Sequence, residues 1–227
     1  MQHILDNPIW NALSSGNAGM AHVHGDAAYI KRDVGLFAGM KNNSAGEFDE
    51  LYRAMPAKSQ IILFTPAHIA VPDSWIIKMR RPVLQMVFPH EKIIDVDSSE
   101  IISLGEKDIA SMTELIQLTN PGPFSSRTIE FGNYEGIFNG DQLIAMTGQR
   151  LQPYNYTEVS AVCTHPGHTG KGYAAKLLRN QLNRIVSANQ IPFLNVYPEN
   201  EAACKLYWKL GFETRKEIVV YFLEKST

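Results

Sequence analysis

A short glycine-rich segment, residues 170–175 (GKGYAA), carries the residue types best suited to holding an anion. Small residues let backbone N–H groups come close to a ligand, and the start of a helix adds unpaired donors and the positive end of its dipole. Lys171, Lys176 and Arg179 place positive charge nearby. The natural ligand is a phosphate or pyrophosphate, although a tight turn that needs glycine only for its backbone angles has the same composition.

The same residues also match the Gly-x-Gly-x-x-Ala fingerprint of dinucleotide-binding folds. Two observations count against that interpretation. Five residues, 165–169, separate the preceding strand-like run from Gly170, whereas the dinucleotide turn is tighter. The next strand-like run, residues 193–197 (FLNVY), has no carboxylate to hold a ribose hydroxyl group.

Histidine and cysteine offer weaker alternatives. The histidines that could share a metal are His22 with His24 and His165 with His168, but no further ligand follows at a suitable spacing, so we predict no metal site. Cys163 lies in an apolar strand-like run and Cys204 in a helical pattern. We interpret both as reduced, buried thiols; a nucleophilic Cys163 is the less favoured alternative.

The elements around the glycine-rich segment follow from hydrophobic periodicity. A helix is predicted over 108–118, a hairpin over 135–149 around Asn139-Gly140-Asp141, and a strand over 156–164. Further predictions are a helix over 172–188, a strand over 193–197, a helix over 200–210 and a last strand over 217–224. Residues 120–124 (NPGPF) are predicted to form a loop, because two prolines and a glycine cannot extend the helix. This order predicts an α/β fold with a mixed sheet and helices on both faces.

The first part of the chain has less regular signals. Strands are predicted over 21–30, 60–64, 75–79 and 83–88, and a short helix over 45–55. Charged and small polar residues replace apolar ones over 89–100, so we place a boundary there. The prediction is an N-terminal α/β domain at 1–97 and a second domain at 98–227.

Composition excludes several classes of protein. The chain has 227 residues, a formal net charge of −2 and 44% hydrophobic residues. This charge gives no sign of the basic surface that general nucleic-acid binding requires. The apolar runs are too short to cross a membrane, and the start lacks the pattern of a secretion signal. We therefore expect a cytoplasmic protein that binds neither nucleic acid nor membrane; a homodimer is compatible with the sequence.

The second half resembles the GNAT superfamily of N-acyltransferases. The segment 162–174 (VCTHPGHTGKGYA) is similar to the superfamily's acyl-CoA motif, Gln/Arg-x-x-Gly-x-Gly/Ala, with Thr169 in place of Gln or Arg. The segment 200–212 (NEAACKLYWKLGF) is similar to its Asn-x-x-Ala-x-x-Leu-Tyr-x-x-x-Gly-Phe signature. The resemblance covers residues 100–224 and implies a GNAT fold, preceded by an N-terminal half that is either degenerate GNAT-like, structural or concerned with acceptor recognition.

The resemblance implies how a cofactor would bind. Acetyl-CoA or another acyl-CoA would act as co-substrate, with its pantetheine arm paired to a strand like one more strand and its pyrophosphate held by backbone amides. The Asn200 side chain would contact the pantetheine, although an N-cap role alone explains this residue. The residues expected to bind the cofactor are Val162, Cys163, Thr164, Thr169, Gly170, Lys171, Gly172, Tyr173, Ala174, Ala175 and Asn200.

The resemblance also implies two catalytic residues. Tyr207 would protonate the departing CoA thiolate, although it also belongs to an apolar helical stripe. Glu158, eleven residues before Thr169, matches the position of the base in some members; a surface-facing glutamate is the alternative. A strand amide near Val162 or Cys163 would stabilise the oxyanion. We expect an N-acetyltransferase that acts on a primary amine; the alternative is a non-catalytic acyl-CoA-binding or regulatory module.

Overall fold

The computed structural model describes residues 3–91, 95–119 and 122–226. The first forty or so of these form a small antiparallel sheet with the strand order β1-β2-β3. One helix packs beside it and a second follows it along the chain. The elements are α1 (Pro8–Leu13), β1 (Ala21–His24), β2 (Ala27–Ile30), β3 (Ala38–Met40) and α2 (Ala45–Ala54). Of these, α1 and β3 were not predicted.

The remaining strands form one eight-stranded sheet in the order β4-β11-β5-β10-β9-β8-β7-β6. All neighbouring strands are antiparallel except β9 and β10, which are parallel. This mixed sheet confirms the predicted fold class. The elements are β4 (Gln60–Thr65), β5 (Trp75–Val87), β6 (Ile102–Ser103), α3 (Ile109–Thr119), β7 (Glu135–Asn139), β8 (Gln142–Gln149), β9 (Tyr156–Thr164), α4 (Tyr173–Ser187), β10 (Ile191–Val196), α5 (Glu201–Lys209) and β11 (Glu213–Lys225).

Strand β5 runs as one piece where two strands were predicted. The predicted strands leave residues 80–82 between them, and Pro82 has no N–H to donate to a neighbouring strand. In the structure Pro82 faces Val219 of β11, while β10 pairs only with residues 84–87 on the other side of β5. At Pro82 one edge of β5 has no partner strand. The absent N–H of proline can face that edge without costing a hydrogen bond, so the strand continues.

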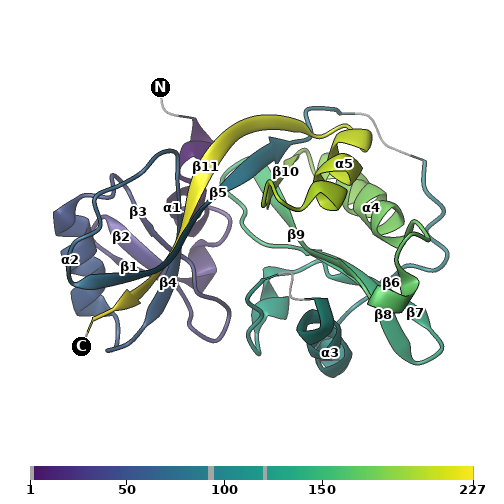
Figure 1. Cartoon of the computed structure of the whole chain (residues 1–227), viewed down its shortest axis with the longest axis horizontal. Helices are drawn as coiled ribbons and strands as arrows, with labels where there is room; N and C mark the ends of the chain where they lie inside the picture. Colours follow the sequence, from purple (N-terminus) through teal and green to yellow (C-terminus); the bar gives the residue numbers. More distant parts are fainter. Residues whose placement is uncertain (1–2, 92–94, 120–121, 227) are drawn as a thin grey trace.

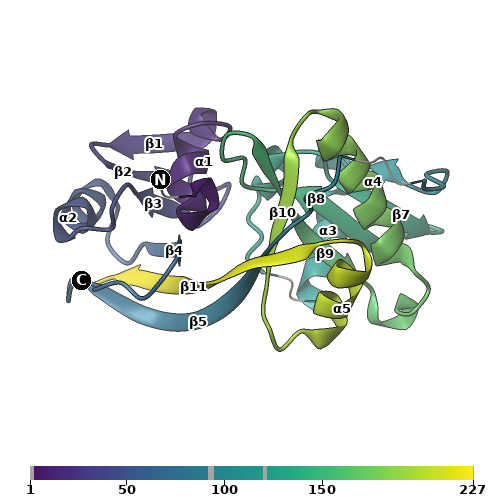
Figure 2. The same cartoon turned by 90° about the horizontal axis from the view of Figure 1, so that it is seen from above.

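The long strands β5 and β11 run from the end of the molecule that carries α2 to the region of β10 and α5 (Figures 1 and 2). They pair along their length, and β5 lies between β11 and β10. The sheet therefore contains strands from both sides of the predicted boundary at residue 97. The division into domains at 1–97 and 98–227 stays a prediction, and the two parts share one sheet.

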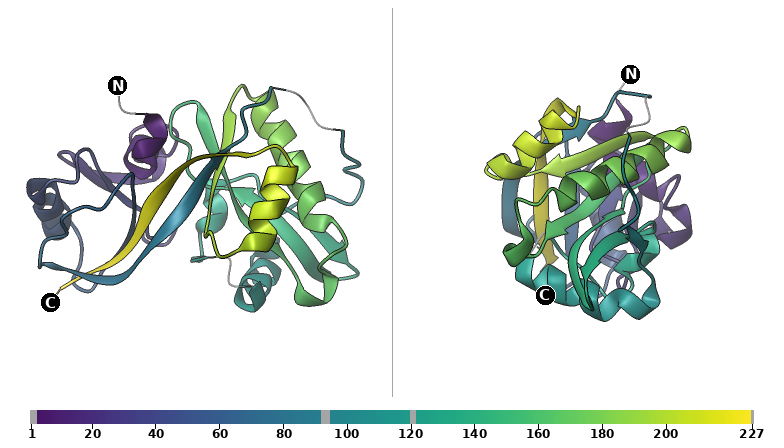
Figure 3. Two further views of the ribbon diagram at one scale, coloured as in Figure 1. Left: turned by 45° about the horizontal axis from the view of Figure 1, so that its top comes forward. Right: turned by 90° about the vertical axis from the view of Figure 1, so that its right-hand side faces the viewer.

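The two faces of the sheet carry different helices. On one face α4 and α5 pack on Val159, Leu194 and Val196, and Figure 3 shows these two helices beside each other. On the other face α3 packs through Met112 and Leu115 in a core that includes Phe193. Because side chains alternate along a strand, neighbouring residues of β9 and β10 point to opposite faces.

The long helix α4 confirms the predicted helical periodicity. Its Leu178, Leu182 and Ile185 are 0%, 1% and 2% exposed and form the stripe that faces the sheet. Gly172 precedes the helix in the left-handed conformation. The helix therefore begins at a fixed place relative to the end of β9. Within the described part of the chain, no helix combines the length and apolar character that a membrane span requires.

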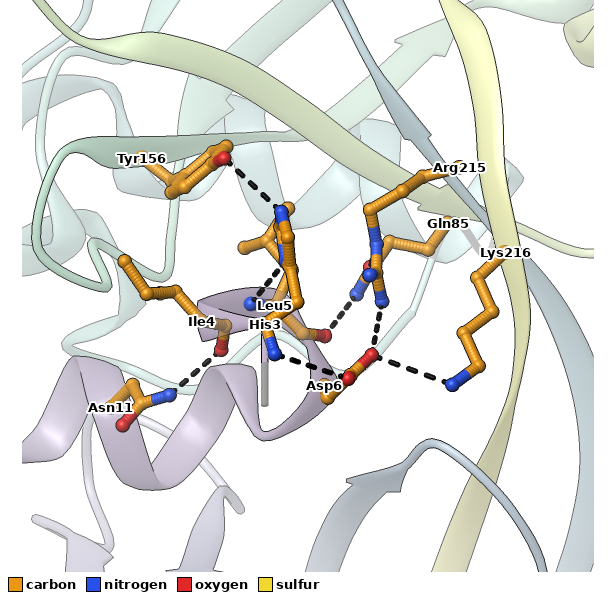
Figure 4. A network of polar contacts seen from close by, with 9 residues as sticks. All are labelled: His3, Ile4, Leu5, Asp6, Asn11, Gln85, Tyr156, Arg215 and Lys216. Atoms are coloured by element: carbon orange, nitrogen blue, oxygen red, sulfur yellow. Dashed lines mark hydrogen bonds and ion pairs between the residues drawn. The ribbon is translucent and has the colours of Figure 1, made fainter. Parts of the chain in front are cut away.

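The N-terminal segment is tied to the centre of the sheet by a polar network around Asp6 (Figure 4). Arg215 of β11 donates to Asp6 Oδ1 at 2.7 Å and to Gln85 Oε1 at 2.5 Å. Gln85 is fully buried and donates to the carbonyl oxygen of Leu5 at 2.9 Å. Lys216 Nζ lies 3.5 Å from Asp6. These contacts hold the start of the chain against both β5 and β11.

Replacing Asp6 by asparagine should lower the free energy of unfolding at pH 7 by about 1–3 kcal/mol, because Arg215 loses a partly buried counter-charge. Burial opposes ionisation of Asp6, but the hydrogen bond and charge of Arg215 and the charge of Lys216 outweigh it, so the pKa of Asp6 lies below its ordinary value of 3.8. This stabilisation is present above that value and is lost as the pH falls through the lowered pKa. Urea unfolding at pH 7 and pH 3 measures both effects.

The matched control is Asp26→Asn. Asp26 and Lys41 form an ion pair in which both side chains are more than half exposed. Such pairs contribute about 0–1 kcal/mol. Equal losses in the two variants would contradict a stabilising role for the Asp6 network.

Candidate functional site

The parallel strands β9 and β10 separate part way along their length. They pair only between residues 156–158 and 191–193. Beyond that point β9 continues to Thr164 beside β8, and β10 continues to Val196 beside β5. The edge of β9 from Val159 to Thr164 that faces β10 is thus free of strand pairing. The sheet is open there, and its two faces communicate.

A β-bulge interrupts the pairing of β9 with β8, in the part of β9 whose other edge is free. The register with β8 shifts between Met146 and Gly148, and Ala161 has a φ of 52°. A positive φ at a residue other than glycine is uncommon and persists only where the surrounding structure holds it. Bulges re-aim the groups of a strand and are frequent beside active sites. Here the bulge comes directly before Val162, at the opening between the strands.

A cavity of about 190 Å³ fills the opening. One part of its wall is apolar and comes from β4, β5, β11 and the residue before β3: Phe37, Ile62, Phe64, Val83, Val220 and Phe222. The polar part comes from β9, β10 and α5 together with the end of β8: Arg150, Ser160, Asn195, Tyr197, Asn200 and Tyr207. Gly122 and Pro123 of the predicted loop also line the cavity; Asn120 and Pro121 lie outside the described residues.

The glycine-rich segment forms a second hollow of about 410 Å³ at the start of α4. Gly170 and Gly172 have φ values of 76° and 83°, which glycine adopts without strain. The first backbone bond of the helix runs from Lys176 N–H to the carbonyl of Gly172 at 3.0 Å. The N–H groups of Tyr173, Ala174 and Ala175 therefore have no partner within the helix. The hollow has the donors that an anion requires.

The charges around this hollow differ in part from the prediction. Arg179 lines it as expected, and so does Lys209, which sequence reasoning missed. Lys176 instead pairs with Glu100 at 2.6 Å and Asp97 at 3.5 Å. Lys171 is exposed and is not part of the lining. The positive charge facing the hollow therefore comes from one residue of α4 and one of α5.

His168 belongs to the predicted acyl-CoA motif and was also considered as a metal ligand; it lines the same hollow. Its Nδ1 is buried without a hydrogen-bond partner among the described residues. Burial lowers the pKa of His168, and the charges of Lys171 and His165 lower it further. No group of three or more potential metal ligands occurs among the residues that the structure describes.

Glu158 is completely buried, so the surface-facing alternative is wrong. Its backbone pairs with Arg150 and Leu151, which brings the two charged side chains together. Arg150 donates to both carboxylate oxygens at 2.7 and 2.8 Å, and Asn195 Nδ2 donates to Oε1 at 2.8 Å. Burial opposes the charge of Arg150, but Glu158 outweighs it and raises the pKa of the guanidinium. Arg150 and Asn195 stand between Glu158 and the cavity.

Tyr207 lines the cavity from α5 and also packs in the core with Phe212, which confirms its place in the apolar stripe; its role as the acid stays a prediction. Burial raises the pKa of Tyr207 well above its ordinary value, with a smaller contribution from Cys204. Asn200 caps α5 by accepting the N–H of Ala203 at 3.1 Å, and it lines the cavity as well.

Most of the other predicted cofactor-binding residues lie at the cavity or the hollow, whereas Cys163 does not. Val162 lies at the cavity, and Thr164 and Thr169 line the hollow beside α4. Cys163 belongs to the core on the α3 face of the sheet. Burial raises the pKa of its thiol to about 11, which favours the interpretation of a neutral, buried thiol. Sequence reasoning missed Arg150 and the aromatic residues of the first half, because no local motif contains them.

Known proteins are similar to this chain in sequence and fold. The FR47-like protein family matches residues 134–221. A crystal structure of a protein from Novosphingobium aromaticivorans, assigned to the GNAT family of acetyltransferases, has 32% sequence identity and a TM-score of 0.92 and covers 100% of both chains. A GCN5-related N-acetyltransferase from Kribbella flavida has 15% identity and a TM-score of 0.63, covers 96% of this chain and 95% of its own, and supports the fold alone.

No curated protein matches the chain. The similarity to the Novosphingobium protein nevertheless extends over the whole length, including the first half and the long strands β5 and β11. It agrees with the open sheet, the glycine turn before α4 and the two motifs found in the sequence. The chain belongs to the GNAT family, and its fold is that of an acetyltransferase.

Proposed function

We propose that the protein transfers an acetyl or other short acyl group from acyl-CoA to a primary amine. The observation that carries this proposal is the free edge of β9, which joins an anion-binding hollow to a partly apolar cavity through the opening in the sheet. A cofactor with a pyrophosphate, a peptide-like arm and a reactive end requires these three features in this order.

The pyrophosphate would bind the N–H groups between Gly170 and Ala175, with Arg179 and Lys209 as counter-charges. Thr169 donates to the carbonyl of Pro166 at 3.2 Å, so its side chain supports the turn and its backbone is left for the ligand. The pantetheine arm would pair with the free edge at Val162–Thr164. Asn200 accepts the Ala203 N–H through Oδ1, which leaves its Nδ2 for the arm. These roles use the donors and edges that the fold leaves unpaired.

The acyl end would reach the cavity beside the bulge at Ala161, where the amide of Val162 is the proposed oxyanion donor. The amine nitrogen attacks the thioester carbon, the C–N bond forms and the C–S bond breaks. The departing sulfur takes a proton from Tyr207, whose raised pKa keeps the phenol protonated at neutral pH. The amine loses one proton, so that an amide and free CoA result.

The base role of Glu158 is part of this proposal, and its contacts define how it would act. A carboxylate that accepts from Arg150 and Asn195 holds both side chains at the cavity wall. It can take a proton from the amine only after one of these donors moves or through a water molecule that they admit. Glu158 therefore also acts as the anion that orients Arg150.

The direct test mixes the purified protein with acetyl-CoA and a panel of primary amines, following free thiol by a colorimetric reagent and acetylated amine by mass spectrometry. We expect thiol release that depends on the amine and equals the product formed. Binding of acetyl-CoA without product from any amine would reject acyl transfer and leave a non-catalytic acyl-CoA-binding module.

Replacing Tyr207 by phenylalanine should lower kcat by about 10²-fold, because general acid catalysis typically contributes 10²–10⁴-fold. The ring and its packing against Phe212 remain, so the affinity for acetyl-CoA should change little. Because burial raises the pKa of Tyr207, the native enzyme should show no loss of activity from phenol ionisation up to pH 10. Rates from pH 6 to 10 for both proteins measure these effects.

Tyr221→Phe is the control. Tyr221 is also completely buried, and its hydroxyl accepts the Ile69 N–H at 3.1 Å at the other end of the sheet. It should lose stability and keep kcat. Equal kcat losses in the two variants would assign the effect at Tyr207 to folding rather than to acid catalysis.

A further inference from the structure

The cavity at the opening of the sheet has an apolar wall that the pantetheine arm does not need. Phe37, Ile62 and Phe64 come from the first half of the chain and are 5%, 3% and 7% exposed. They belong to the core on the α3 face, whereas Tyr207 belongs to the core on the face of α4 and α5. The cofactor and this wall therefore approach the opening from opposite faces of the sheet.

The charges at this wall cancel. The Arg150 guanidinium lies over the Phe37 ring at 4.9 Å and is bound through two nitrogens to the Glu158 carboxylate. Arg81, which stacks on Tyr197 at the cavity edge, pairs with Glu199 at 2.9 Å. Neither pair leaves a full charge to receive a second charged group of a ligand. An occupant of this wall must be apolar.

One polar atom at the wall has no partner. Asn195 Oδ1 is buried without a hydrogen bond among the described residues. The amide cannot be turned over, because Nδ2 must donate to Glu158 Oε1 at 2.8 Å. Oδ1 therefore requires a donor, and Asn195 shares the α3 face of the sheet with Phe193 of the same strand.

Resting on the proposed acyl transfer, we infer that the acceptor is a small primary amine with an uncharged apolar substituent, aryl or alkyl. The substituent packs on Phe37, Ile62 and Phe64, and one N–H of the amine donates to Asn195 Oδ1. An engineered apolar cavity of about 150 Å³ binds benzene; the 190 Å³ here also receives the acyl end, so the substituent can be no larger than a benzene ring.

The same wall explains how the amine becomes a nucleophile. An apolar surface with cancelled charges disfavours an ammonium ion, so the amine enters or remains without its extra proton. Asn195 Oδ1 holds one N–H and directs the lone pair at the thioester carbon. The C–N bond forms as the C–S bond breaks, the nitrogen releases a proton and the CoA sulfur gains one. Asn195 is in this sense a positioning residue for the nucleophile.

Two amines of equal size test the substrate class. Pentylamine and 1,4-diaminobutane have the same number of heavy atoms and differ in whether the far end is a methyl or an ammonium group. Since burying an unpaired charge is strongly unfavourable, we expect kcat/KM for pentylamine to exceed that for 1,4-diaminobutane by about 100-fold or more. Benzylamine should be acetylated with a kcat/KM similar to that for pentylamine. Equal rates, or preference for the diamine, would overturn the inference and leave acyl transfer standing.

Binding separates this inference from the proposed function. Benzylamine is titrated into the protein saturated with CoA, which lacks an acyl group, and binding is followed by ligand-observed NMR. Binding of benzylamine together with failure to acetylate any amine would reject the transfer reaction but keep the apolar site. Acetylation of polar amines without binding of benzylamine would keep the transfer reaction and reject the apolar site. Absence of both would reject both.

Two variants locate the site. Phe37→Ala should raise the KM for benzylamine about 10-fold, and Phe37→Leu should restore most of the loss, because a large apolar side chain is what the substituent needs. Asn195→Ala should lower kcat more than it raises KM, since it misdirects the amine. In each case the Kd for acetyl-CoA should stay within about 2-fold of the native value. An unchanged KM in Phe37→Ala would overturn the placement of the substituent.

Discussion

Valine at position 172 should weaken acetyl-CoA binding about 100-fold. Gly172 has a φ of 83°, which a β-branched residue strongly disfavours, and an added Cβ meets no protein atom within 4 Å. Because valine disfavours this φ, the backbone must change conformation at residue 172. The N–H groups at the start of α4 then no longer point at the pyrophosphate. Each hydrogen bond to a charged group contributes about 1.5–3 kcal/mol, so losing one or two corresponds to about 10²-fold. Isothermal titration calorimetry with acetyl-CoA measures the change.

Gly140→Val is the matched control for this substitution. Gly140 lies in the turn between β7 and β8, has a φ of 59° and has equally open space around its would-be Cβ. Its replacement imposes similar backbone strain far from the hollow, so stability should fall by about 1–2 kcal/mol while the Kd for acetyl-CoA stays unchanged. Native affinity in Gly172→Val would show that the turn does not hold the cofactor.

Glutamine at position 158 should lower turnover by about 10²–10⁴-fold, the range that base catalysis supplies. The substitution removes the carboxylate that the partly buried Arg150 guanidinium contacts through two nitrogens, so the protein also loses up to about 3–5 kcal/mol of stability. Rates and unfolding free energies should be measured on the same preparations, at temperatures where both proteins are folded.

Glu135→Gln and a double variant separate the two roles of Glu158. Glu135 is 2% exposed and pairs with Arg184 at 2.5 Å on β7 and α4, so the same change costs stability there without touching the cavity. The double variant Glu158→Gln with Arg150→Met removes both charges together. Recovery of native turnover in it would show that Glu158 only neutralises Arg150, whereas a loss that persists supports the base.

The parts of the site that the sequence predicts are those set by neighbouring residues. Gly170 and Gly172 favour positive φ angles by their residue type, and the start of α4 follows directly, so the glycine turn and the start of the helix are predictable from one segment. The stripe of Leu178 and Leu182 predicts which side of α4 meets the sheet. Asn139-Gly140 predicts the hairpin of β7 and β8 because the turn is local.

The remaining parts depend on contacts between distant residues. Arg150 follows β8 in a stretch without a motif, and its position at the cavity depends on pairing with Glu158 across the sheet. Phe37 lies at the wall because it pairs with Ile62 of β4, and β4 in turn pairs with β11. Nothing in the local pattern of β5 indicates that it inserts between β10 and β11. Hydrophobic periodicity shows that a strand is buried but does not identify its partners.

The position of β11 governs when the protein can become functional during synthesis. Both β4 and β5 are made early, yet β11, their shared neighbour, follows every other described strand of this sheet in the sequence. Until it leaves the ribosome, two long strand edges are bare and the wall at Val220 and Phe222 does not exist. Pairing across such sequence distances is slow and prone to aggregation. A nascent chain stalled before residue 213 should therefore bind chaperones and show none of the activity, rather than a fraction of it.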